Sequence, residues 1–129
     1  ADQPVSKETT GAVEFSPALI VDGEALVDEY SGWYAINPRA CLGQSSKKEI
    51  LMLVIEGRMI GRSLGCELAA CVEECSTILE RHGCMQAMNL DGGTSAVLWY
   101  DGQYVTKCSN TSIVSRLMPN AWVYGTRES

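Results

Sequence analysis

The sequence predicts an α+β fold in which a mixed or antiparallel sheet packs against one principal helix. Short apolar runs typical of strands recur along the chain, and one segment carries apolar residues at three- and four-residue spacing. Asp-Gly pairs, which favour tight hairpin turns, follow two of the apolar runs. With 129 residues, 46% of them hydrophobic and 20% charged, the chain has the size and composition of one globular domain. One helix covers few of so many strands, so we expect this chain to be part of a larger domain.

The first half of the chain predicts a tail, two strands and a covering loop. Residues 1–12 are polar and typical of a tail or linker, so the predicted domain spans residues 13–129. Residues 18–21 predict a strand that enters a tight turn, and residues 50–55 predict a strand buried on both faces. The irregular aromatic segment 28–38 is typical of a loop that covers another surface.

A single amphipathic helix is predicted at about residues 65–82, where charged residues fill the positions between the apolar ones. Glu67 falls in its first turn, where the helix dipole favours a negative charge. Gly83 can end the helix in a left-handed conformation. His82, in the last turn, is typical of a polar cap, and we assign it no catalytic role.

Four further strands are predicted after the helix, and the Asp101-Gly102 pair joins the second and third of them in a hairpin. Their predicted ranges are 84–90, 95–100, 103–105 and 121–124.

The charge and the length of the apolar runs exclude several classes of partner. A net charge of −6 and a pI near 4.7 argue against a nucleic-acid groove or an anionic membrane surface. No apolar run approaches the roughly 20 residues that span a bilayer, so we expect no membrane insertion.

The six cysteines leave their own chemistry open. In an exported protein an even number of them could form disulfides, but the pairing cannot be read from the sequence, and buried thiols also act as small hydrophobic groups. Because no C-x-x-C pair is present and His82 is the only histidine, the sequence argues against a zinc site. We expect no metal and no other cofactor.

The segment Asn89-Leu90-Asp91-Gly92-Gly93-Thr94-Ser95 carries the strongest candidate site. Paired glycines after a strand indicate a sharp turn or a close approach by another group. If side chains alternate along the strand, Asn89 and Asp91 point to the same side and form a binding or catalytic pair. The alternative is a turn in which Asp91 only accepts hydrogen bonds from backbone N–H groups.

A phosphate-binding loop is one possible interpretation of this segment. It resembles the first phosphate loop of the actin and sugar-kinase superfamily, with Asp91 one position out of register. That loop lies near the N-terminus of a much larger chain, and no G-x-x-x-x-G-K-[ST] motif is present. Nucleotide binding is therefore the weaker interpretation.

A second resemblance covers almost the whole chain, from about Phe15 to Tyr124. Four motifs follow one another in the order found in the phosphodiester glycosidase family, whose members include the enzyme that uncovers mannose 6-phosphate by removing N-acetylglucosamine from a phosphodiester. The four motifs are Pro38-Arg39-Ala40-Cys41-Leu42-Gly43-Gln44, Ser63-Leu64-Gly65-Cys66-Glu67-Leu68-Ala69, Asn89-Leu90-Asp91-Gly92-Gly93-Thr94-Ser95 and Arg116-Leu117-Met118-Pro119-Asn120-Ala121.

The chain departs from the family pattern in two places. Thr94 stands where the family usually has a third glycine. The Asn-Gly-Gly-Phe-type motif of the family's N-terminal half has no match, so we expect that half to be missing here and to lie on a longer or a separate chain.

The resemblance implies a glycoside hydrolase that releases a sugar, such as N-acetylglucosamine, from a sugar-1-phosphodiester in a glycan. Asp91 is then the nucleophile or base, Asn89 binds sugar hydroxyls, and Arg39 and Arg116 clamp the phosphate. Glu67 is either a second carboxylate or only a favourable charge at the helix start. The remaining candidate substrate-binding residues are Gly65, Gly92, Gly93, Thr94 and Ser95.

The same resemblance implies a carbohydrate or sugar-phosphate partner and an exported protein, extracellular or in the cell envelope. The alternative from another functional class is a module that binds cell-wall or exopolysaccharide glycan without turning it over.

Overall fold

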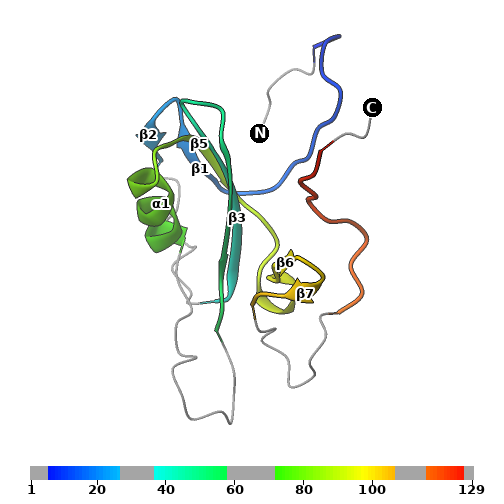
Figure 1. The fold of residues 1–129 in the computed structure, drawn as a ribbon. Helices are drawn as coiled ribbons and strands as arrows, with labels where there is room; N and C mark the ends of the chain where they lie inside the picture. The colour runs from blue at the N-terminus through cyan, green and yellow to red at the C-terminus, as the bar shows by residue number, and fades with distance from the viewer. Residues whose placement is uncertain (1–5, 27–36, 58–71, 107–115, 127–129) are drawn as a thin grey trace.

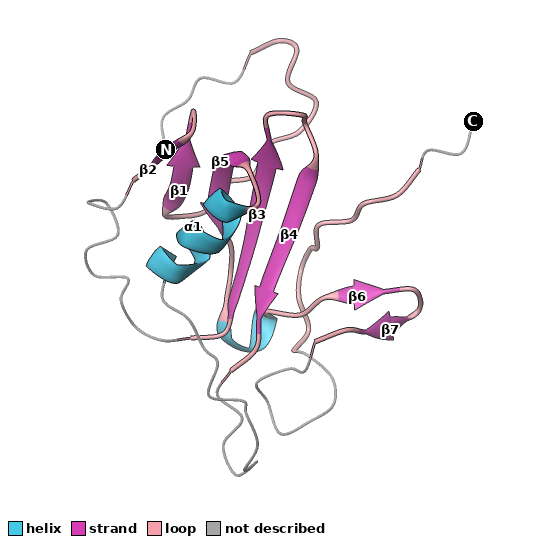
Figure 2. Ribbon diagram, turned by 60° about the vertical axis from the view of Figure 1, so that its left-hand side comes forward, coloured by secondary structure: helices cyan, strands magenta, loops and turns pink. Residues whose placement is uncertain are grey.

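The computed structural model of the chain describes residues 6–26, 37–57, 72–106 and 116–126. Its main layer is an antiparallel sheet with the strand order β2-β1-β5-β3-β4, and helix α1 lies across one face of it (Figure 1). A separate two-stranded sheet, β6–β7, lies to one side (Figure 2). The strands and helices are β1 Ala18–Val21, β2 Glu24–Ala25, β3 Arg39–Ser45, β4 Ile50–Ile55, α1 Val72–Arg81, β5 Cys84–Asn89, the 3-10 turn η2 Gly93–Ser95, β6 Trp99–Tyr100 and β7 Gln103–Tyr104.

This arrangement confirms the predicted α+β fold, with an antiparallel sheet and one principal helix among the described residues. The part of the predicted helix before Val72, which includes Gly65 and Glu67, lies outside those residues, as does most of the predicted loop 28–38. Within the described ranges, no helix has the length and hydropathy needed to cross a membrane.

The hydrophobic core lies between α1 and the sheet. Leu19 and Ile20 of β1 pack there with Val72, Cys75 and Leu79 of the helix, all of them at most 1% exposed. Burial of such apolar side chains is the main term that stabilises the fold. The helix comes close to β3 at Gly43, where a Cβ would lie 2.6 Å from Cys84 Sγ and 3.3 Å from Leu79 Cδ2.

Strand β3 was not predicted as a strand, yet it lies inside the sheet between β5 and β4. It pairs along its length with β4, from Arg39 opposite Ile55 to Gln44 opposite Ile50. Its residues alternate regularly between buried and half-buried. The buried positions hold arginine, cysteine, glycine and serine rather than branched apolar residues, so the alternation is hard to see in the sequence.

Strand β4 is found at the predicted residues, but the prediction that both its faces are buried is wrong. It is the edge strand beside β3, and Ile50 at its start is 46% exposed. One face of β4 therefore packs against the core, and the other face of the strand is only half-buried.

The predicted helix end and hairpin turns are confirmed. Gly83 follows α1 with a φ of +81°, and His82 Nδ1 lies 2.8 Å from the carbonyl oxygen of Ile78, as a polar cap would. In the Asp22-Gly23 and Asp101-Gly102 turns both residues have positive φ, between 50° and 80°, as type I′ hairpins require. The strand predicted at 84–90 is present as β5, Cys84–Asn89.

Two strand predictions in the last third are wrong. Residues 95–98 do not extend a strand, because the chain first forms η2 and only residues 99–100 pair, with β7. Residues 121–124 form no strand and are exposed. A short apolar run alone does not make a strand where no neighbouring strand supplies the backbone hydrogen bonds.

Candidate functional site

The site is built on the turn that follows β5, residues 90–95. The turn is held against the start of β3 by backbone hydrogen bonds: Leu90 N donates to Ala40 O at 2.8 Å, and Gly93 N donates to Pro38 O at 3.0 Å. The 3-10 turn η2 within this segment is closed by Ser95 N, which donates to Gly92 O at 3.1 Å. The polar side chains of the turn therefore stand on a fixed backbone at the end of the sheet.

The two glycines of the turn each have a structural reason. A Cβ on Gly92 would lie 2.5 Å from Pro38 O, which is a backbone atom that cannot rotate away. Gly93 has a φ of +60°, in the left-handed region that favours glycine. The glycine pair thus allows the turn to lie directly on β3.

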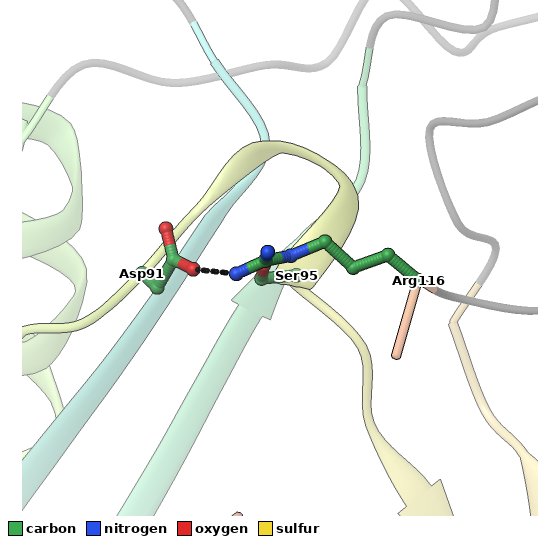
Figure 3. Close-up of polar contacts among 3 residues, drawn as sticks. All are labelled: Asp91, Ser95 and Arg116. Atoms are coloured by element: carbon green, nitrogen blue, oxygen red, sulfur yellow. Dashed lines mark hydrogen bonds and ion pairs between the residues drawn. The ribbon is translucent and has the colours of Figure 1, made fainter. Parts of the chain in front are cut away.

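Three polar side chains come together on the exposed side of this turn (Figure 3). Arg116 Nη2 lies 2.8 Å from Asp91 Oδ2, and Arg116 Nε donates to Ser95 Oγ at 2.6 Å. The arginine comes from a segment 21 residues beyond Ser95 and spans both groups with one guanidinium.

The ion pair between Asp91 and Arg116 is exposed to solvent. The two side chains are 55% and 51% exposed. Exposed pairs of this kind contribute only about 0–1 kcal/mol to stability, because water screens the charges and the long side chain loses freedom. Both charges are therefore accessible to a solute at little energetic cost to the fold.

Asn89 lies in the interior, apart from these three residues. It is 1% exposed, its Nδ2 donates to Ser16 O at 3.0 Å, and its Oδ1 accepts the Cys41 thiol at 3.9 Å. Its backbone N also donates to Pro17 O at 3.1 Å. The expectation that Asn89 and Asp91 share a face is wrong, because β5 ends at Asn89 and the alternation of side chains ends with it.

The Arg39 side chain is also buried, unlike those of Asp91 and Arg116. It is 5% exposed at the first position of β3, next to the Pro38 carbonyl that holds Gly93. The pKa of the nearby Cys41 thiol is nevertheless raised overall, because the neighbouring Cys75 and burial outweigh the effect of the Arg39 charge. Arg39 is thus a buried charge of the interior, not the surface ion pair typical of an arginine.

Thr94 and Ser95 belong to η2 and are half-buried. Gly65 and Glu67 lie outside the described residues, so the structure does not place them relative to the turn. Among the residues that the structure describes, no group of three or more His, Cys, Asp and Glu side chains is arranged to hold a metal ion.

Three contributors to the site were missed by sequence reasoning. The Pro38 carbonyl fixes the glycine turn, the Ser16 carbonyl orients Asn89, and the Cys41 thiol contacts the same amide. Two of these are backbone groups that any residue could supply, so they carry no signal in the sequence. Cys41 could be found only by pairing β3 with β5, which places it opposite Asn89.

Comparison with known proteins identifies a family for this chain. The family model described as phosphodiester glycosidase matches residues 1–124. The SPbeta prophage-derived uncharacterized protein YomE of Bacillus subtilis is 26% identical over 113 residues, which are 85% of this chain and 17% of that protein.

Two solved structures share the fold. The zebrafish N-acetylglucosamine-1-phosphodiester alpha-N-acetylglucosaminidase catalytic domain, auto-inhibited by its pro-peptide, superposes with a TM-score of 0.59 and 19% identity, over 77% of this chain and 36% of that one. A hypothetical protein from Synechocystis superposes with a TM-score of 0.57 and 24% identity, over 78% of this chain and 19% of that one. The chain therefore spans well under half the length of these relatives.

Proposed function

The chain belongs to the phosphodiester glycosidase family, and we propose that the turn bearing Asp91 binds a sugar-1-phosphodiester and takes part in its hydrolysis. The observation that carries the proposal is the exposed cluster of Asp91, Ser95 and Arg116, in which one guanidinium contacts a carboxylate and a hydroxyl. A phosphodiester and a sugar require these three kinds of group: a cation for the phosphate, a hydrogen-bonding hydroxyl, and an anion for the anomeric carbon.

In the proposed complex the substrate phosphate replaces Asp91 at the Arg116 guanidinium. A guanidinium can bind two phosphate oxygens at once, and Ser95 Oγ, 2.6 Å from Arg116 Nε, can donate to a third. The exchange costs little because the existing ion pair is exposed and weak. Arg116 then stabilises the negative charge that collects on the departing phosphate monoester.

Asp91 is the proposed carboxylate for the sugar side of the reaction. When the bond between the anomeric carbon and the phosphate oxygen breaks, positive charge develops on the sugar ring. A carboxylate released from Arg116 can stabilise that charge as a nucleophile, or can take a proton from the attacking water. Phosphate is a good leaving group, so the proposal requires no strong general acid.

Asn89 and Arg39 support the turn from behind in this proposal. Asn89 fixes the end of β5, and Arg39 is a buried charge at the start of β3, the strand on which the turn lies. We therefore shift both from the direct contacts that the sequence predicted to positioning roles.

The activity of the whole protein is also a proposal, because the chain spans a minor part of its relatives. We propose that a further part of the family domain, on a longer or a separate chain, completes the substrate site. We also propose that the substrate is a glycan-linked sugar phosphate, such as one carrying N-acetylglucosamine, and that it is met outside the cell or in its envelope. The activity for which the zebrafish relative is named supports the substrate class.

The proposal is tested by replacing Asp91 in the full-length protein and assaying a synthetic N-acetylglucosamine-1-phosphodiester. We expect Asp91→Asn to lower kcat at least about 100-fold, because the replacement removes the negative charge that the transition state needs. Asp101→Asn, on the exposed hairpin turn, is the matched control and should leave hydrolysis unchanged. Full activity in Asp91→Asn would sink the proposal.

A second candidate function is glycan binding without turnover. The hairpin that follows the site presents three aromatic rings to solvent: Trp99 is 59% exposed, Tyr100 73% and Tyr104 40%. Such rings combine an apolar face with a polar edge and can stack on a sugar ring. Calorimetric binding of sugar phosphates in the absence of any product would favour this function over hydrolysis.

A further inference from the structure

The main sheet has a second face, which points away from α1. Cys41 of β3 packs in the core with Val72 and Leu79 of the helix, so its neighbours Ala40 and Leu42 point to the opposite side of the sheet. The strand register places the residues that pair with these two on the same side. The second face consists of Ala18, Ala40, Leu42, Met52, Val54 and Met88.

The second face is apolar across four neighbouring strands, β1, β5, β3 and β4. All six of its side chains are apolar and half-buried. Gln44, Gln86 and Ile50 continue the face at one end, so none of these nine positions holds a charged residue. An antiparallel sheet that turns one face to water normally carries polar residues there. The second face therefore has the composition of an internal layer rather than of a solvated surface.

The described part of the chain supplies no second layer for this face. Within the described ranges α1 is the only α-helix, and Figure 1 shows it on one side of the sheet. The residues of the β6–β7 hairpin and residues 119–126 are exposed, so neither segment packs as a layer on the sheet. A sheet with two apolar faces is stable only when each face is covered by another element.

We propose that the second face is the docking surface for the further part of the phosphodiester glycosidase domain, which packs on it through an apolar layer of its own. The lengths of the relatives support this occupant, because the chain spans only 17% to 36% of the proteins that it matches. In those relatives more polypeptide accompanies this unit than the unit itself contains. A domain of that size has the material for a second layer on the sheet.

A second copy of the chain is the other occupant that an apolar face could bind, and the charge of the chain argues against it. Each copy carries a net charge of −6, so two copies repel each other as they approach. In a symmetric dimer the second face would meet itself, and it holds no charged residue that could offset the repulsion. The further part of the family domain needs to supply only a complementary apolar surface.

Docking at the second face places the further part of the domain beside the candidate site. Met88 of the face precedes Asn89, the last residue of β5, and Ala40 of the face accepts the backbone hydrogen bond of Leu90 at 2.8 Å. A layer that covers Met88 and Ala40 therefore lies next to the start of the turn of Asp91, where it can add groups to the site. The docking surface does not depend on the reaction, so it stands whether or not the turn hydrolyses a phosphodiester.

The test is to oxidise the native full-length protein, with any separate chain that completes the domain, by hydrogen peroxide and to follow methionine sulfoxide by mass spectrometry. Trypsin releases Met52 in residues 49–58, and fragment ions separate Met88 from Met85 in residues 82–107. Met85 is 40% exposed and lies outside the second face, so it is the internal reference. We expect Met52 and Met88 to oxidise at least about 10-fold more slowly than Met85, because a close-packed layer excludes the oxidant. Rates within about 3-fold of the Met85 rate would overturn the proposal.

Thermal unfolding of two valine variants gives an independent measurement. Val54→Thr keeps the size of the side chain but adds a hydroxyl, which a covering layer would separate from water. We expect it to lower the melting temperature of the full-length protein by about 2–6 °C. Val105→Thr, the matched control at a position that is 55% exposed, should lower it by less than about 1 °C. Equal shifts in the two variants would contradict the proposal. Protection of Met52 that is lost when a dimer of identical chains dissociates on dilution would also contradict it, because a second copy would then cover the face.

Discussion

Two polar residues at the end of β5 show how position decides the role of a side chain. Asn89, the last residue of the strand, is buried and joins the segment before β1 to Cys41. Asp91, two residues later, is 55% exposed and contacts Arg116. A buried amide without hydrogen-bond partners would cost about 1–3 kcal/mol, so Asn89 keeps the partners that it has. Asp91 is exposed and weakly paired, so it can exchange Arg116 for a ligand.

Gly92 gives the sharpest test of the turn at this scale. Replacing it with alanine adds a Cβ 2.5 Å from Pro38 O, so the turn or the start of β3 must move. We expect Gly92→Ala to lower the free energy of unfolding by about 1–3 kcal/mol, measured by urea denaturation.

Gly11→Ala is the control for that substitution, because a Cβ there has no atom within 4 Å. Equal stability of the two variants would mean that the turn does not lie on Pro38 as the structure shows.

The sequence indicated the site only in part, for reasons visible in these residues. The motifs predict Asp91, Ser95 and Arg116 as site residues, and the structure brings these three into contact. The same motifs predict Asn89 and Arg39 as site residues, but the structure buries both. Which side of a turn a residue occupies depends on where the strand ends, and that end is set by tertiary hydrogen bonds such as Gly93 N to Pro38 O.

At the scale of elements, the sequence predicts turns and helix ends correctly, but it does not reliably predict strands. Asp-Gly turns and the end of α1 depend on neighbouring residues, and they were predicted correctly. Strand β3 was missed and the strand at 121–124 was predicted in error, because strands depend on distant partners. A single short apolar segment therefore indicates only that a strand can form.

Helix α1 should contribute most of its stability through its inner face. Leu79 is 1% exposed and packs beside Gly43 and the core of the sheet. We expect Leu79→Ala to lower the free energy of unfolding by about 2–5 kcal/mol, because it removes buried surface and leaves a cavity. Chemical denaturation followed by far-UV circular dichroism measures the change.

Glu80→Ala, on the exposed side of the same helix turn, is the matched substitution and should change stability by less than about 0.5 kcal/mol. A similar loss in both variants would contradict the conclusion that packing of Leu79 on the sheet stabilises α1.

At the scale of the molecule, the described chain has two parts with different burial. The sheet of β1 to β5 and helix α1 share one core, whereas β6 and β7 form a hairpin whose residues are all exposed. Trp99 and Tyr104 stabilise that hairpin by an edge-to-face contact, with ring centres 4.9 Å apart. The site turn lies between the two parts in sequence, so its environment depends on both.

This division predicts two classes of amide protons in hydrogen exchange. Amides of β5, which is hydrogen-bonded to β1 on one side and β3 on the other, should exchange only when the whole core opens. Amides of the β6–β7 hairpin should exchange much faster, because an isolated two-stranded hairpin is marginally stable in water. NMR can measure the free energy of opening for each amide at several urea concentrations below the unfolding transition. For Ala87 this free energy should fall with urea as steeply as the free energy of global unfolding does, whereas for Tyr104 it should stay small and nearly constant. A common slope for both residues would show instead that the hairpin unfolds together with the core, and the turn of Asp91 would then belong to one cooperative unit rather than to the border between two.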